Sequence, residues 1–123
     1  MVLKDNLYRI KSVGSEGEPF VIELNPDCEI YRMHFPGHPI TPGVCIIDIV
    51  TELLRLYSSK ELELKTVSNA KFVTVINPLI TPEISIDIKK YDCDESARCV
   101  SASVIMHDRD EKIFAKLSLT YSY

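Results

Sequence analysis

The feature that most constrains the fold is one segment, Val44 to Tyr57, that is apolar around almost its whole circumference. Its apolar residues are too dense for a half-exposed strand, and it is too long for a buried one, so it predicts a helix. We expect Thr41 to be the N-cap and Pro42 the first helical residue, where no backbone N–H is needed. A single helix of this kind must be enclosed by the rest of the chain.

The rest of the chain supplies mainly strands. Leu7 to Val13 and Phe20 to Leu24 are rich in strand-forming residues, and Gly14-Ser15-Glu16-Gly17 between them predicts a hairpin turn. After the helix, Val67 to Ile76 predicts one strand, and apolar and polar residues then alternate in three further segments. Those segments are 84–89, 100–107 and 113–122, with polar turns expected at 92–95 and 108–110.

This order predicts an α+β fold, in which a curved antiparallel sheet, with its last four strands in a meander, wraps around one long helix. The 123 residues suit a single domain spanning 1–123, and a hydrophobic fraction of 46% is enough for one core. A net charge of -4 argues against a nucleic-acid partner, which would select a basic face.

Neither a membrane span nor a secretory signal is expected, because no apolar segment approaches the ~18 residues that a span requires. We therefore expect a cytoplasmic protein. The four cysteines form no Cys-x-x-Cys pair, which predicts reduced thiols rather than disulfides.

Chemistry is concentrated in the run His34-Phe35-Pro36-Gly37-His38-Pro39-Ile40-Thr41-Pro42-Gly43-Val44, which is followed by Asp48. An imidazole lies in a Pro/Gly-rich loop, backbone amides follow at the start of a helix, and a carboxylate lies about one turn inside it. Amides at a helix N-terminus favour developing negative charge, and Gly43 permits close approach of a carbonyl. The run therefore holds a base, an acid and an oxyanion donor.

The same run resembles the signature of the 3-hydroxyacyl-acyl carrier protein dehydratases, which are hotdog-fold enzymes of fatty acid synthesis. Their pattern is His-Phe-Pro-Gly-x-Pro-x-x-Pro-Gly with an acidic residue fourteen positions after the histidine, and His34 and Asp48 have this spacing. The resemblance implies a hotdog fold and dehydration of 3-hydroxyacyl thioesters to 2-enoyl thioesters. It implies no metal and no organic cofactor.

Carried onto this chain, the resemblance makes His34 the base that removes the α-proton and Asp48 the group that protonates or positions the departing hydroxyl. Gly43 would donate its backbone N–H to the thioester carbonyl. In the family, base and acid come from opposite subunits, so we expect a homodimer or a multiple of dimers, favoured also by apolar outer-face residues such as Ile105 and Phe114. The expected substrate-binding residues are Tyr31, Met33, Phe35 and Val44.

The expected partner is an acyl carrier protein or a coenzyme A thioester. Because carrier proteins and this chain are both acidic, docking would need a local basic patch, for which we expect Arg32, His38 and Lys71. The spacing of His34 and His38 does not indicate a metal site, since Pro36-Gly37 breaks the helix that would align the two rings.

Several alternatives remain open at this stage. Asp48 can belong to a solvated stripe with Thr51, Glu52 and Arg55, and Cys45 can be a packing residue rather than a nucleophile. Two departures mark a divergent member: Glu52 replaces a glutamine that supports the acid, and Thr81-Pro82-Glu83 replaces a Pro-Gly-Asp turn. The rival functions are an acyl-thioester hydrolase of the same fold and a non-catalytic acyl-binding subunit.

Overall fold

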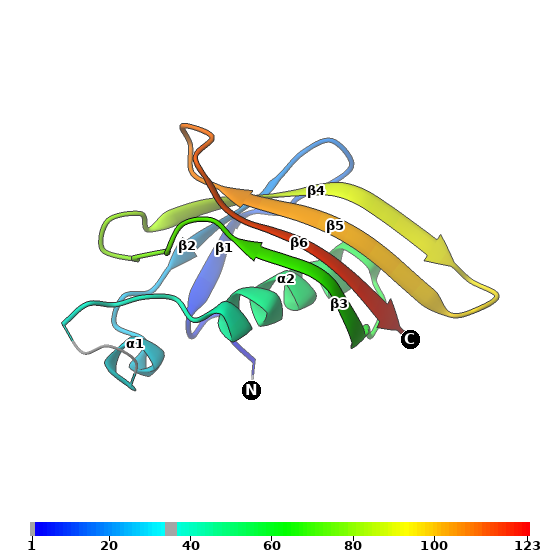
Figure 1. The fold of residues 1–123 in the computed structure, drawn as a ribbon, viewed down its shortest axis with the longest axis horizontal. Coiled ribbons are helices and arrows are strands. Elements are labelled where there is room, and N and C mark those ends of the chain that lie inside the picture. The colour runs from blue at the N-terminus through cyan, green and yellow to red at the C-terminus, as the bar shows by residue number, and fades with distance from the viewer. Residues whose placement is uncertain (1, 34–36) are drawn as a thin grey trace.

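One curved antiparallel sheet wraps around one long helix in the computed structural model, which describes residues 2–33 and 37–123 (Figure 1). The sheet has the strand order β1-β2-β4-β5-β6-β3. This confirms the predicted α+β architecture. Its elements are β1 (Tyr8–Ser12), β2 (Phe20–Leu24), α1 (Glu29–Met33), α2 (Gly43–Ser58), β3 (Glu63–Phe72), β4 (Glu83–Asp94), β5 (Cys99–His107) and β6 (Ile113–Ser122).

The predicted meander of four strands is wrong for β3. Among the last four strands, only β4, β5 and β6 follow one another as neighbours, whereas β3 pairs with β6 at the far edge and β4 pairs with β2. The bounds of β3 also differ from the predicted 67–76. Beyond Phe72 the regular pairing with β6 ends, since the N–H groups of Val73 and Thr74 both donate to the one carbonyl of Phe114.

The turn predicted at 92–95 lies further along the chain. β4 continues to Asp94, which is in register with Cys99, and the turn is closed by the N–H of Arg98 donating to the Glu95 carbonyl. The polar composition of the strand end explains the difference, since this part of the hairpin is exposed and has no apolar face to mark it.

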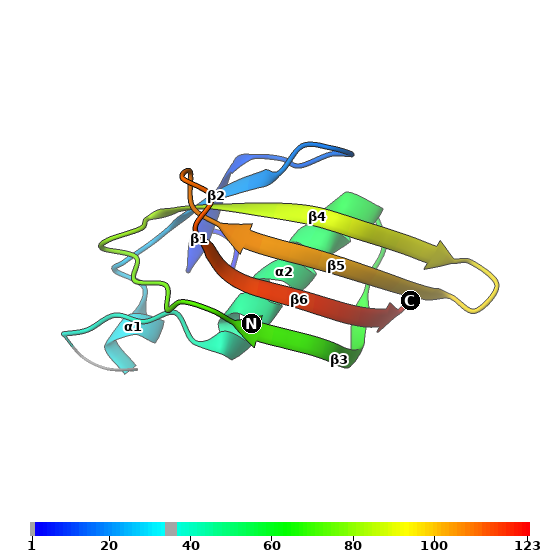
Figure 2. The same cartoon turned by 45° about the horizontal axis from the view of Figure 1, so that its top comes forward.

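Helix α2 lies against the concave side of the sheet (Figures 1 and 2). Seven of its residues are buried, which agrees with the predicted apolar helix; they are Cys45, Ile46, Ile49, Val50, Thr51, Leu53 and Leu54. The prediction of Thr41 as N-cap is wrong: Pro42 is the N-cap, and no side chain caps this end. The Thr41 hydroxyl is not available because it is bonded to Tyr31.

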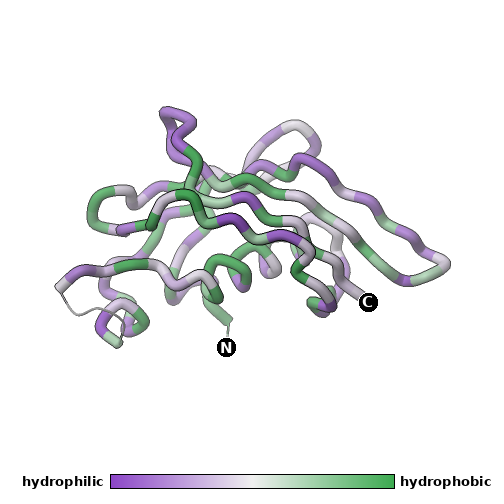
Figure 3. Tube along the Cα trace, in the orientation of Figure 1, coloured by the Kyte–Doolittle hydropathy of each residue, from purple (hydrophilic) through white to green (hydrophobic). Residues whose placement is uncertain are grey.

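Strand β3 is exposed along its whole length. All ten of its residues are exposed, and it forms one edge of the sheet, so one side of its backbone has no neighbouring strand. Its exposed residues include the apolar Leu64, Val67 and Phe72. The connection after β3 carries further exposed apolar residues, Val75, Leu79 and Ile80 among them, and the same region is hydrophobic in Figure 3.

Candidate active site at the start of helix α2

The first turn of α2 presents unpaired backbone donors. The first intrahelical bond runs from the N–H of Ile46 to the carbonyl of Pro42, at 3.1 Å. The N–H groups of Gly43, Val44 and Cys45 therefore have no intrahelical partner, as at the beginning of any α-helix. With the partial positive charge of the helix N-terminus, they favour an oxygen on which negative charge develops.

Gly43 packs closely against an aromatic ring from β3. A Cβ atom at this position would lie 3.1 Å from Cζ and 3.2 Å from Cε2 of Phe72. The ring at the end of β3 therefore rests against the start of α2, and a side chain at position 43 would require this half-exposed ring to shift by a few tenths of an ångström. The two residues line an apolar hollow of about 390 Å³ together with Ile46 and Val73.

Asp48 lies on the exposed side of α2. Val44 is 67% exposed, and Asp48, four residues later and so on the same helix face, is also exposed. Within residues 2–33 and 37–123, the Asp48 carboxylate makes no hydrogen bond or ion pair. It is close enough to Cys45 to act on that thiol, whose pKa is raised by burial and further by the Asp48 charge.

The buried Cys45 is a packing residue. It is 9% exposed, and the raised pKa keeps its thiol protonated, so it lacks the thiolate that a nucleophile needs. This agrees with the alternative that Cys45 is a packing residue rather than a nucleophile.

The other polar residues of the expected stripe have internal partners. The Thr51 hydroxyl donates to the carbonyl of Ile47 at 2.9 Å and lies 2.9 Å from the hydroxyl of Tyr121. The Arg55 Nε donates to the Leu62 carbonyl at 3.0 Å. The solvated-stripe interpretation is therefore wrong for Thr51, which is buried, and it fits Asp48 best.

Glu52 holds the N-terminal segment on α2. Its Oε2 accepts from the N–H of Leu3 at 2.8 Å, and its Oε1 accepts from the N–H of Lys4 at 3.0 Å and from the Tyr8 hydroxyl at 2.8 Å. Burial, followed by the bond to Glu52, raises the pKa of Tyr8. All three partners are donors, so this position suits a carboxylate better than the amide of a glutamine.

The predicted substrate-binding residues do not form one surface. Tyr31 is 3% exposed, and its hydroxyl is bonded to Thr41, whereas Met33 and Val44 are open to solvent. Tyr31 is thus a buried structural residue, which corrects its assignment to the lining. His34, the predicted base, and Phe35, a predicted lining residue, lie outside the described residues.

The predicted docking residues Arg32, His38 and Lys71 are all exposed, at the end of α1, in the following loop and on β3. His38 also lines a hollow of about 340 Å³ with Ile40 and Phe114, and this hollow includes Lys112. The sequence analysis did not connect Lys112 with the motif, because only the fold brings it near His38.

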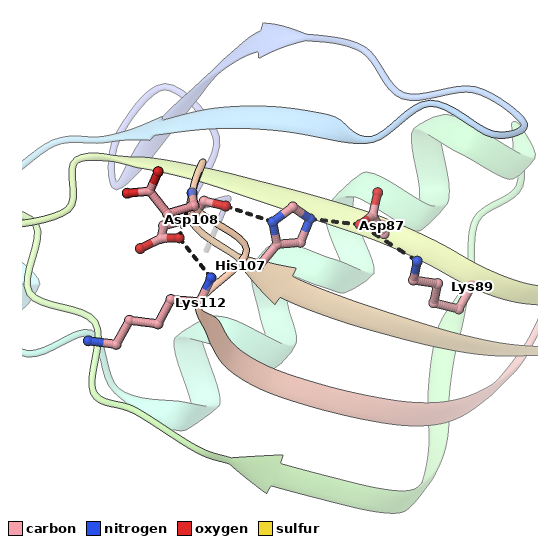
Figure 4. Close-up of polar contacts among 6 residues, drawn as sticks. Asp87, Lys89, His107, Asp108 and Lys112 are labelled. Atoms are coloured by element: carbon pink, nitrogen blue, oxygen red, sulfur yellow. Dashed lines mark hydrogen bonds and ion pairs between the residues drawn. The ribbon is translucent and has the colours of Figure 1, made fainter.

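The imidazole of His107 lies on the outer face of the sheet (Figure 4). The His107 Nε2 is 2.7 Å from Asp87 Oδ2, and its Nδ1 is 2.7 Å from the Asp108 carbonyl oxygen. Lys89 lies 3.9 Å from the same carboxylate. Both ring nitrogens are thus occupied, and the pair joins β4 to the end of β5. Sequence reasoning missed this pair, since its members are twenty residues apart.

In the described part of the chain, no group of three His, Cys, Asp or Glu side chains is arranged to hold a metal ion. No described helix is long and apolar enough to cross a membrane.

Comparison with known proteins places the chain in a family. The family model of the ApeI-like proteins, described as ApeI dehydratase, matches residues 14–109. The chain belongs to this family. The matched region contains the motif loop, Gly43 and Asp48.

Curated relatives are 3-hydroxyacyl-acyl carrier protein dehydratases named FabZ. The protein from Caulobacter sp. (strain K31) is 37% identical over 57 residues, which are 39% of this chain and 35% of the relative. The protein from Clostridium acetobutylicum is 35% identical over 69 residues, which are 50% of this chain and 49% of the relative. The chain thus spans about a third to a half of the length of these relatives.

Solved structures share the fold. The dehydratase heterocomplex ApeI:P from Xenorhabdus doucetiae has a TM-score of 0.60 at 18% identity, over 85% of this chain and 88% of that one. A protein from the thioesterase superfamily has a TM-score of 0.63 at 14% identity, over 93% of this chain and 82% of that one. At these identities the likeness shows the hotdog fold alone, which confirms the predicted fold.

Proposed function

We propose that this chain dehydrates 3-hydroxyacyl thioesters, carried on an acyl carrier protein or coenzyme A, to 2-enoyl thioesters. The observation that carries the proposal is the start of α2, where free amides at Gly43 and Val44 stand beside an apolar hollow and an exposed carboxylate follows at Asp48. The family membership and the FabZ relatives support the same reaction class.

In the proposed reaction, a base removes the α-proton, and the electron pair moves toward the thioester carbonyl. The Gly43 N–H meets the charge that develops on the carbonyl oxygen. The C–O bond at the β-carbon then breaks as Asp48, in its acid form, gives a proton to the leaving hydroxyl, so that water departs. His34 is the proposed base, as the motif implies.

We propose that the site is completed by a second subunit that pairs along β3. This strand offers an unpaired edge of ten exposed residues, and unpaired edges with apolar side chains favour association. Its charges are self-complementary: antiparallel pairing with Val67 opposite Val67 places Glu63 of each copy opposite Lys71 of the other. Within one chain, Lys71 lies opposite Lys116, and the partner's carboxylate would offset that repulsion.

This arrangement favours a homodimer. The ApeI:P neighbour is a heterocomplex, so a second hotdog chain is the alternative partner. In that case this chain would supply one part of a shared site or act as a non-catalytic subunit.

The test is to incubate the purified protein with 3-hydroxyacyl and saturated acyl thioesters while following enoyl absorbance and free thiol. We expect enoyl product and no thiol release. Asp48→Asn should lower turnover by ~10²–10⁴-fold, whereas Asp110→Asn, an exposed aspartate in the β5–β6 turn, should not change it. Thiol release from the saturated thioester would favour the hydrolase. No turnover by the isolated protein would favour the non-catalytic subunit.

Carrier docking is proposed for Arg32 and His38, since Lys71 is assigned to the subunit contact. Arg32→Glu should raise KM for carrier-bound substrate and leave a pantetheine thioester unaffected. An equal loss on both substrates would contradict this docking role.

A further inference from the structure

A buried hydrogen bond joins the two ends of the motif loop. Tyr31, on α1, is 3% exposed, and its hydroxyl lies 2.8 Å from the Thr41 hydroxyl, which is also buried. Tyr31 precedes segment 32–40 in the chain and Thr41 follows it, so the bond joins the two residues that flank this segment. The segment contains the proposed base His34, and Gly43 follows Thr41 by two residues.

Thr41 is itself held firmly. Its backbone N–H donates to the carbonyl of Ile76 at 2.9 Å, and α2 begins directly after it, with Pro42 as N-cap. The side-chain bond therefore ties α1 to the point from which α2 starts. Because α1 has five residues and Tyr31 is its buried one, this helix has little stability of its own and depends on such anchors.

We propose that Tyr31 and Thr41 form a positioning latch, which fixes the two ends of the motif loop relative to the amides at the start of α2. The inference rests on the proposed dehydratase function. Neither residue is a catalytic residue, because both hydroxyls are buried and bonded to each other. The latch acts by geometry: proton transfer and the oxyanion contact require the base and the Gly43 N–H to meet one substrate, and a misplacement of about 1 Å can cost ~10²-fold in rate.

The chain contains a matched control for this bond. Thr41 and Thr51 are the buried polar residues of the described chain, and each is bonded to a buried tyrosine. The Thr51–Tyr121 bond measures 2.9 Å and joins the middle of α2 to β6, so it is also a buried bond between a threonine and a tyrosine hydroxyl but does not bracket the loop. The Thr51 hydroxyl donates in addition to the Ile47 carbonyl.

The test compares Tyr31→Phe, Thr41→Val, the double variant and Thr41→Ser with Tyr121→Phe. Each single latch variant leaves one buried hydroxyl without its partner and loses stability, whereas the double variant leaves none and regains it. We expect kcat to fall about tenfold in both single variants and also in the double variant, with KM within about twofold. Thr41→Ser should keep kcat, and Tyr121→Phe should keep it within about twofold.

Hydrogen exchange gives a readout that needs no turnover. Amides in 37–46 should lose protection in Tyr31→Phe, Thr41→Val and the double variant, and keep it in Tyr121→Phe. A double variant that regains wild-type kcat and protection together with its stability would overturn the latch, because the bond would then be only structural. An equal loss of kcat in Tyr121→Phe would also overturn the latch. Unchanged protection overturns the latch whatever the activity, whereas absent turnover with lost protection contradicts only the proposed function.

Discussion

Glu52→Gln should destabilise the fold without changing the chemistry, because the Glu52 carboxylate serves as an acceptor for three donors. These are the N–H groups of Leu3 and Lys4 and the hydroxyl of Tyr8, at 2.8 to 3.0 Å. A glutamine has one oxygen and one NH2 group, so in either orientation its amide faces at least one backbone N–H, and that donor loses its partner.

The magnitude follows from these contacts. Leaving one donor unsatisfied costs ~1–3 kcal/mol, and the remaining bonds lose their charge assistance, which accounts for about half the strength of such bonds. Since the carboxylate is partly exposed, we expect the free energy of unfolding to fall by about 2–3 kcal/mol. For a domain of this size, this lowers Tm by about 6–15 °C.

The assay is urea unfolding followed by circular dichroism, with thermal unfolding as a second measure. Tyr8→Phe should cost about 1–2 kcal/mol, and the double variant should cost less than the sum, because Tyr8 and Glu52 share a bond. Glu61→Gln, at an exposed glutamate just after α2, is the matched control and should change stability by at most ~0.5 kcal/mol. Turnover of folded Glu52→Gln should stay within about twofold of wild type.

The reasoning is refuted if Glu52→Gln is as stable as Glu61→Gln. A large loss of kcat at unchanged stability would instead restore the expectation that residue 52 supports the acid.

Two further predictions concern assembly and pH. Glu63→Lys or Lys71→Glu alone should raise the dimer dissociation constant by roughly 2–30-fold, since each creates two like-charge pairs worth ~0.2–1 kcal/mol apiece. The double exchange should restore the wild-type dissociation constant. Sedimentation equilibrium measures this constant, and failure of the double exchange to restore dimers contradicts the register. Burial raises the pKa of Tyr31 to about 12, above its ordinary value near 10, so its contribution to stability is complete below pH 10 and is lost as pH rises toward 12. Urea midpoints across this range should therefore fall less steeply in Tyr31→Phe than in wild type, and equal slopes would contradict the shift.

The sequence by itself determined the elements whose pattern has a strong local cause. The apolar segment after Pro42 predicted a buried helix, and the alternation in 100–107 and 113–122 predicted β5 and β6 to within one residue, whereas the alternation in 84–89 marked only the first half of β4. The motif around Gly43 likewise predicted a candidate site, because a glycine at a helix start combines an open backbone amide with room for a neighbour. That neighbour is the Phe72 ring.

Tertiary structure alone decided where the exposed and long-range parts lie. β3 carries no alternating pattern, since it is exposed on both faces, so its bounds and its pairing with β6 depend on contacts distant in the chain. The same holds for single polar residues. Glu52, Thr41 and Tyr31 look like a stripe residue, a helix cap and a lining residue, yet each is committed to a partner that only folding brings within 3 Å. A hydrogen bond depends on the position of both partners, and a local pattern specifies only one of them.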